Sequence, residues 1–209
     1  DYGRAFDWRR VTSGSGWPDG FIHFADPKLV ATKKPAISGT KRVGSVLTAS
    51  TGSWKPAPSS FAYQWYSAGK AVSGATDQTF TPRASDLADQ VTVKVTARRA
   101  SFPSAAATSS AVTVAAGRFA TTVPTVTGSP TVDSTLTAVR TSWTPVAKKT
   151  TYQWFADGQA IAGATGKTLT LAPEQVDQTI TVSIEGTKAG YTTASTRSAE
   201  TTAVAPGTM

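Results

Sequence analysis

The sequence contains no cysteine and no asparagine, and it has one histidine and one methionine among 209 residues. Without cysteine, neither a disulfide framework nor a thiolate metal site can form. Without asparagine there is no acceptor for N-glycosylation, and tight hairpin turns must use glycine and aspartate, as at Ala68-Gly69 and Asp157-Gly158. No apolar run reaches membrane-spanning length and no signal peptide is present. Because the chain begins at Asp1 without a methionine, we expect a processed product or a fragment of a longer protein.

Acidic side chains are also scarce, with 13 Asp and Glu against 21 Lys and Arg, which gives a formal net charge of +8. A basic balance favours polyanions such as nucleic acid or an anionic cell envelope. The basic residues are scattered as pairs, such as Arg9-Arg10 and Lys148-Lys149, and lack the interleaved aromatic residues of single-strand binders. We therefore expect a solvated basic surface and no nucleic-acid partner.

Residues that could carry catalysis are few. The single histidine, His23, has no serine and aspartate frame around it, so it forms no nucleophilic triad. The acids Asp86, Asp89, Glu174 and Asp177 fall at expected turns, where they act as turn formers or caps. The sequence has no phosphate loop, zinc-ligand spacing or dinucleotide fingerprint. These observations predict a chain without enzymatic activity, cofactor or metal.

An internal duplication dominates the chain. The segment Ala62-Tyr63-Gln64-Trp65-Tyr66 returns as Thr151-Tyr152-Gln153-Trp154-Phe155, and a shift of 89 also aligns Trp54 with Trp143 without a gap. Tandem copies of this size are abutting domains joined by a short linker. The expected organisation is an arm or the end of an upstream domain (1–34), a first domain (35–115), a linker (116–123), a second domain (124–204) and a tail (205–209).

Short strands separated by turn residues fill each repeat. In the first they are expected at 36–38, 45–50, 61–66, 70–72, 79–81, 90–97 and 109–114. Seven short strands in about 80 residues indicate an all-β sandwich. Strand alternation places Tyr63 and Trp65 on the inner face and Gln64 and Tyr66 on the outer face. The clean alternation over 90–97 and over its copy predicts a central strand.

With these strands in place, the sequence resembles the bacterial immunoglobulin-like repeats of secreted and surface proteins from high-GC Gram-positive bacteria (actinobacteria) or their phages. The resemblance rests on Pro35-Ala36-Ile37-Ser38-Gly39, Val43-Gly44-Ser45-Val46-Leu47-Thr48-Ala49, Gly52-Ser53-Trp54, Tyr63-Gln64-Trp65, Gly69 through Thr76 and Ala189-Gly190-Tyr191. It implies two tandem immunoglobulin-like β-sandwich domains preceded by a short aromatic-rich arm. It also implies that Trp65 and Trp154 are core tryptophans, with aliphatics such as Ala49 and Val93 filling the space of the usual disulfide.

Three positions depart from the motif. Ala100-Ser101-Phe102 stands in place of Ala-Gly-Tyr in the first repeat, and Asp133 and Thr141 replace the equivalents of Gly44 and Gly52 in the second. These changes indicate divergent loops on a shared core, and they argue against one ligand site common to both repeats.

The unrepeated first thirty residues carry aromatic side chains at Tyr2, Phe6, Trp8, Trp17, Phe21 and Phe24. The segment is too hydrophobic for a free tail and too short for a domain. Three interpretations remain open: the last strands of an upstream domain, an arm packed on the first repeat, or an arm that docks on a partner, including another copy of the chain.

Candidate binding residues are aromatic. Trp54 and Trp143 lie in proline-containing loops, where they form either exposed stacking platforms or buried caps over one end of each sandwich. Tyr66 and Phe155 point outward by strand parity and are candidates for an interface or for cross-strand packing.

These expectations describe a non-catalytic extracellular module that spaces, anchors or binds within a larger bacterial surface or secreted assembly. Its expected partner is a protein or a glycan of the cell envelope. Two alternatives remain: the accessory C-terminal region of a secreted hydrolase, and a structural subunit of a phage virion or extracellular filament docked through residues 1–30.

Overall fold

The computed structural model describes residues 28–140 and 142–207, and it confirms the all-β fold class. In the first repeat the elements are β1 (Val30–Lys33), β2 (Ile37–Gly39), β3 (Leu47–Ala49), β4 (Ser53–Lys55), β5 (Ser60–Ser67), β6 (Lys70–Ala71), β7 (Thr79–Phe80), the 3-10 turn η1 (Ala84–Asp86), β8 (Gln90–Arg98), β9 (Ala105–Thr108) and β10 (Val112–Thr113). In the second they are β11 (Thr125–Thr127), β12 (Thr135–Val139), β13 (Lys149–Ala156), β14 (Gln159–Ala160), β15 (Thr168–Thr170), the 3-10 turn η2 (Pro173–Gln175), β16 (Ile180–Thr187) and β17 (Ala194–Arg197).

The chain divides into two compact units whose bounds do not coincide with the repeats. Of the described residues, one unit comprises 28–38, 48–79 and 92–111. The other comprises 39–47, 80–91, 112–140 and 142–207, which include the described part of the second repeat.

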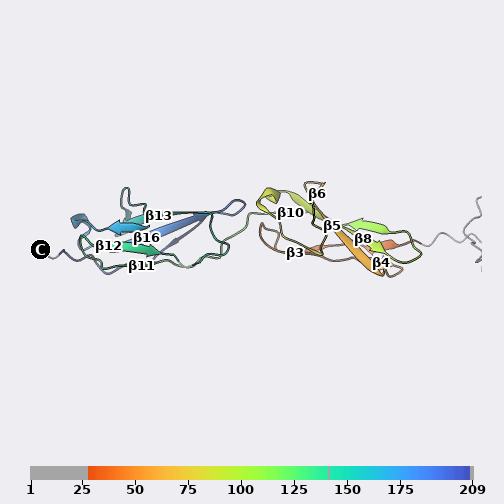
Figure 1. Ribbon diagram of the computed structural model, residues 1–209, viewed down its shortest axis with the longest axis horizontal. Helices are drawn as coiled ribbons and strands as arrows, with labels where there is room; N and C mark the ends of the chain where they lie inside the picture. The colour runs from red at the N-terminus through yellow and green to blue at the C-terminus, as the bar shows by residue number, and fades with distance from the viewer. Residues whose placement is uncertain (1–27, 141, 208–209) are drawn as a thin grey trace, which may run out of the picture. The chain divides into compact units, whose positions relative to one another are not determined.

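The second repeat is a two-layer sandwich of antiparallel sheets. One sheet has the strand order β11-β12-β15 and the other β14-β13-β16-β17, and Figure 1 shows β11 and β12 on one side and β13 and β16 on the other. β13 and β16 pair along eight residues of each strand, from Lys149↔Thr187 to Ala156↔Ile180. Their inner faces are apolar and pack with the opposite sheet, because alternate side chains of a strand share one face. The buried core residues are Leu136, Ala138, Trp154, Ala156, Leu171, Ile180, Val182, Ile184 and Val204.

The first repeat has two corresponding sheets and, in addition, the two-stranded sheet β1-β4. Its sheets follow the orders β2-β3-β7 and β10-β8-β5-β6, with β9 also paired to β8. β8 alternates buried valines with exposed or half-buried polar residues, and it lies between β5 on one side and β9 and β10 on the other. Trp65, Ala49 and Val93 are all buried.

The hairpin turns use the residues that the sequence indicated. Ala68 and Gly69 have φ values of 46° and 76°, and Asp157 and Gly158 have 46° and 80°. Two consecutive positive φ values define the type I′ turn that joins β5 to β6 and β13 to β14. Asp157 fixes its turn further, because its Oδ1 accepts hydrogen bonds from the Thr179 backbone N–H (2.8 Å) and hydroxyl (3.0 Å).

Both repeats satisfy the polar atoms of the Tyr-Gln-Trp motif in the same way. The indole N–H of Trp65 donates to the Asp77 carbonyl and that of Trp154 to the Gly166 carbonyl, each at 2.9 Å. The Gln153 amide donates to the carbonyls of Trp154 and Ile161 at 2.9 and 2.8 Å, and Gln64 makes the equivalent pair of bonds. The motif therefore stabilises the sandwich through side-chain hydrogen bonds to backbone carbonyls of neighbouring segments.

In the first repeat, a serine interrupts the chain where it pairs with β8 at the edge of the sheet β10-β8-β5-β6. The strand expected at 109–114 is therefore wrong in its bounds. The chain pairs with β8 through β9 and again through β10, and the hydroxyl of Ser109 accepts the Val93 backbone N–H between them at 3.1 Å. Alanine-rich β9 has low strand propensity, which hides it in the sequence. Ser198 accepts the Val182 N–H at 3.0 Å in the second repeat.

Replacing Ser198 by alanine should lower the free energy of unfolding by about 1–2 kcal/mol, because the buried Val182 N–H loses its acceptor. Ser195→Ala, on the exposed face of the adjoining strand β17 (Ala194–Arg197), is the matched control and should change stability by less than about 0.5 kcal/mol. Urea denaturation followed by circular dichroism measures both. Equal effects of the two substitutions would show that the buried serine has no special role.

The segments expected before each repeat make backbone pairings with that repeat. β1, placed in the arm, pairs with β4 from Val30↔Lys55 to Lys33↔Ser53. In the expected linker, Ala120 and Thr144 exchange backbone hydrogen bonds of 2.7 and 3.0 Å. Gly117 donates to the Gly190 carbonyl at 2.9 Å and accepts from the Thr192 N–H at 3.0 Å. These pairings involve small and polar residues, which carry no hydrophobic periodicity to reveal them.

Candidate functional site

The two loop tryptophans are buried. Trp54 is 8% exposed and Trp143 is 2% exposed, so the exposed-platform interpretation does not describe them. Trp54 lies on β4, whose pairing with β1 turns the ring toward Leu29 and Ala97. Its indole N–H donates to the Thr51 carbonyl at 2.8 Å. The arrangement is that of a cap over one end of the sandwich.

Trp143 is packed from several sides. The ring of Phe119 lies 5.8 Å from it between centroids, and the Arg140 guanidinium carbon lies 5.8 Å from its centroid. A Cβ placed on Gly186 would overlap the indole ring, with 2.8 Å to Cε3, and would lie 3.1 Å from the Ala147 Cβ. The indole therefore packs directly against the backbone of β16 at Gly186, which has no side chain. Almost none of the Trp143 side chain is exposed to solvent.

Tyr66 and Phe155 lie on the outer faces of β5 and β13 and are half-buried. Tyr66 pairs across the turn with Ala71, and Phe155 with Ala160. The two positions differ in what covers the ring. The guanidinium carbon of Arg197 stands 3.7 Å from the centroid of the Phe155 ring, while the residue equivalent to Arg197 in the first repeat is Thr108.

The outer face of the sheet β14-β13-β16-β17 carries mainly hydroxyl and amide groups. The register sets Phe155 opposite Thr181, and Arg197 opposite Ser183. The hydroxyls of Ser183 and Ser195 are 3.0 Å apart. The residues that share this face, here called the second-repeat outer face, are Lys149, Thr151, Gln153, Phe155, Thr181, Ser183, Glu185, Thr187, Ser195 and Arg197.

Two members of this face escaped the sequence analysis. Arg197 lies on β17, which was not expected as a strand, so its side could not be assigned by alternation. Strand alternation places Thr181 on the outward face of β16, and the structure buries it to 6% exposure. The available signal was the copy difference between Thr108 and Arg197 at one position of the repeat.

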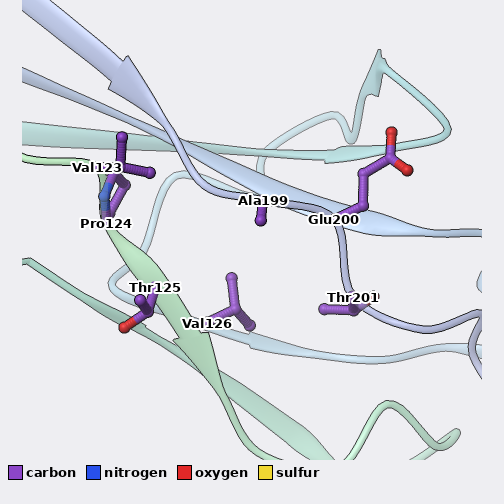
Figure 2. Close-up of a pocket in the computed structure, with 7 residues that line it drawn as sticks. All are labelled: Val123, Pro124, Thr125, Val126, Ala199, Glu200 and Thr201. Carbon is purple, nitrogen blue, oxygen red and sulfur yellow. The ribbon is translucent and has the colours of Figure 1, made fainter.

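A shallow hollow of about 330 Å³ lies between β11 and the segment that follows β17. It is lined by Val123, Pro124, Thr125, Val126, Ala199, Glu200 and Thr201. Figure 2 shows Val126 and Thr201 directed into the space, and the Glu200 carboxylate directed away from it. The lining is small and mostly apolar, which suits side-chain packing better than proton or group transfer.

The remaining predicted residues lie outside the described part of the chain. The arm aromatics Tyr2, Phe6, Trp8, Trp17, Phe21 and Phe24, together with His23, fall in this segment. Over residues 28–140 and 142–207, no three His, Asp or Glu side chains gather to hold a metal ion. Within the same ranges no helix is long and apolar enough to cross a membrane.

Comparison by sequence finds no relatives. No known protein family matches the chain. No curated protein matches it either.

Several solved structures match the chain at low sequence identity. The three N-terminal domains of the bacteriophage RB49 highly immunogenic outer capsid protein (Hoc) match 79% of this chain at 17% identity with a TM-score of 0.38, and the match spans 58% of that chain. The amphioxus IgVJ-C2 molecule matches 83% at 14% identity with a TM-score of 0.33, over 99% of that chain. Tandem Ig repeats of Dlar match 83% at 16% identity with a TM-score of 0.23, over 95% of that chain. The described residues form two repeats built of antiparallel β-sheets and belong to the all-β class.

Proposed function

We propose that the chain is a non-catalytic extracellular module that spaces, anchors or binds on behalf of a larger bacterial surface or secreted assembly. The observation that carries this proposal is the contrast between core and surface in the two repeats. The core tryptophans, the glutamine side-chain hydrogen bonds and the turns are the same in both. The outward positions differ, as in Tyr66 against Phe155 and Thr108 against Arg197.

A scaffold that keeps its packing and varies its surface suits a binding or spacing role, because function is carried by sites placed on a fold. The net charge of +8 favours an anionic partner. An anionic bacterial cell envelope fits that requirement. The proposal also includes the N-terminal arm (1–34) as a second segment that docks on a partner.

Co-sedimentation of the full chain with envelopes from a high-GC Gram-positive bacterium tests this function. We expect saturable retention at 0.15 M salt, where charges further apart than about 8 Å are largely screened. The double substitution Lys148→Gln and Lys149→Gln removes two exposed positive charges. If the binding is specific, the amount of this variant that is retained should lie within about twofold of the amount retained for the unsubstituted chain. Retention that never saturates, or that vanishes at this salt concentration, contradicts an anchoring role.

A further inference from the structure

The second-repeat outer face holds a cation fixed on an aromatic ring. Arg197 is on β17 and Phe155 on β13, and β16 lies between these two strands. The arginine side chain therefore crosses β16 to bring its Cζ to 3.7 Å from the Phe155 centroid. A separation this short, within the roughly 6 Å limit for cation–π contacts, sets the guanidinium directly over the ring.

The guanidinium keeps its donors free. Arg197 is exposed, and its contact with Phe155 is its one side-chain interaction among residues 28–140 and 142–207. A guanidinium has five N–H donors in a rigid plane that matches the two oxygens of a carboxylate. Because Phe155 holds this plane in place, less side-chain entropy is lost when an anion binds.

A second group on the same face also lacks a partner. The Thr181 hydroxyl is buried, in a residue 6% exposed, and makes no hydrogen bond. Thr181 shares the face with Phe155 and lies on the strand that the arginine crosses. Unsatisfied buried hydroxyls are rare and unfavourable, so each one calls for an explanation. The Thr181 hydroxyl is covered by the protein, so it does not itself contact a ligand.

The composition of the face favours a hydroxylated ligand over a protein. The exposed large aliphatic side chains of the described residues are Val30, Val46, Leu87, Val123, Val139 and Val146, and none is on this face. A protein interface needs an apolar centre with aromatic or aliphatic anchors. Here a single half-buried ring is surrounded by hydroxyls, including the Ser183–Ser195 pair.

We propose that the second-repeat outer face binds an acidic saccharide, whose carboxylate pairs with the Arg197 guanidinium and whose hydroxyls lie over the Ser183–Ser195 pair. Phe155 is the positioning residue that holds the guanidinium plane. The first repeat lacks the site, because Thr108 and Lys94 stand where Arg197 and Ser183 stand in the second. This inference rests on the proposed binding function and names its ligand class.

Isothermal titration of the full chain with a short oligogalacturonate tests the site, with the methyl-esterified oligosaccharide as the neutral comparison. We expect binding of the acid form and not of the ester. Arg197→Gln should weaken binding about tenfold or more, because a charge-assisted bidentate pair is lost. Phe155→Leu should weaken it severalfold, since the guanidinium is no longer held. Thr108→Arg combined with Lys94→Ser should create a second, weaker site beside Tyr66.

Lys149→Gln is the matched control, because it removes one exposed charge from β13 without touching the stack. It should change affinity less than twofold, and thermal unfolding should show every variant folded. The inference is overturned if the oligogalacturonate does not bind, if Arg197→Gln and Lys149→Gln weaken binding equally, or if a poly-glutamate peptide competes as well as the saccharide. Envelope retention that survives Arg197→Gln would overturn this site and leave the proposed function standing.

Discussion

Replacing Trp154 by alanine should remove about 3–5 kcal/mol from the free energy of unfolding of the second repeat, which is the cost of deleting a large buried aromatic side chain. The indole is fully buried in the core with Leu136 and Ile184, and its N–H donates to the Gly166 carbonyl. A small domain has a total stability of about 5–15 kcal/mol, and small sandwiches lie toward the lower part of that range. Calorimetry and near-UV circular dichroism should show a lower melting temperature and a loss of fixed aromatic packing.

Two variants separate volume from hydrogen bonding. Trp154→Phe keeps most of the buried area but leaves the Gly166 carbonyl without its donor, so we expect a smaller loss of about 1–3 kcal/mol. Trp65→Ala, at the equivalent position of the first repeat, should cost as much as Trp154→Ala, because its burial and its indole bond are the same. A loss below about 1 kcal/mol for Trp154→Ala would be incompatible with the packing described.

Gly186→Ala should destabilise the second repeat even though glycine to alanine in a strand normally stabilises it by about 0.5–1 kcal/mol. The added methyl group would overlap the Trp143 ring and press on Ala147. Overpacking of this kind costs about 1–3 kcal/mol, and we expect the upper end because neighbours on two sides block relaxation. Chemical denaturation of the full chain gives the change directly.

The ring of Trp143 should be the cause of that loss. Trp143→Phe removes the two indole carbons that the new methyl would meet, so Gly186→Ala should cost less in this background, and the double-mutant cycle should show coupling. The first repeat provides the natural comparison, because Ala97 occupies the equivalent of Gly186 beside Trp54. Additive effects of the two substitutions would contradict the overlap.

The elements that the sequence predicted best are those with strong periodicity and defined turn chemistry. Alternating valines along β8, the paired Tyr-Gln-Trp motifs and the Asp157-Gly158 turn each constrain the backbone locally, so each can be recognised without tertiary information. Copy-to-copy agreement added further support, because the same pattern at a fixed offset indicates the same structure.

The candidate site could not be predicted to the same extent. Trp54 and Trp143 look like loop residues until β1 and Ala120 are seen to pair beside them, and those pairings carry no periodic signal. The stack of Arg197 on Phe155 depends on the register of β17 with β16 and on the order of three strands. Register and strand order are long-range properties, which a single sequence does not encode in any local pattern.

The hydrogen bonds of Gly117 and Ala120 also set where the second repeat can be separated from the rest of the chain. A fragment that began at Pro124 would lose the backbone partners of Thr144 and Thr192 and the Phe119 ring that packs on Trp143. The backbone at Thr144 would then be unpaired, and one side of the Trp143 indole would be open to solvent. An unpaired strand edge beside an exposed apolar ring promotes association between copies of the chain. For expression, proteolysis or domain grafting, we therefore expect a fragment that begins at Gly117 to be more stable and less prone to association than one that begins at Pro124.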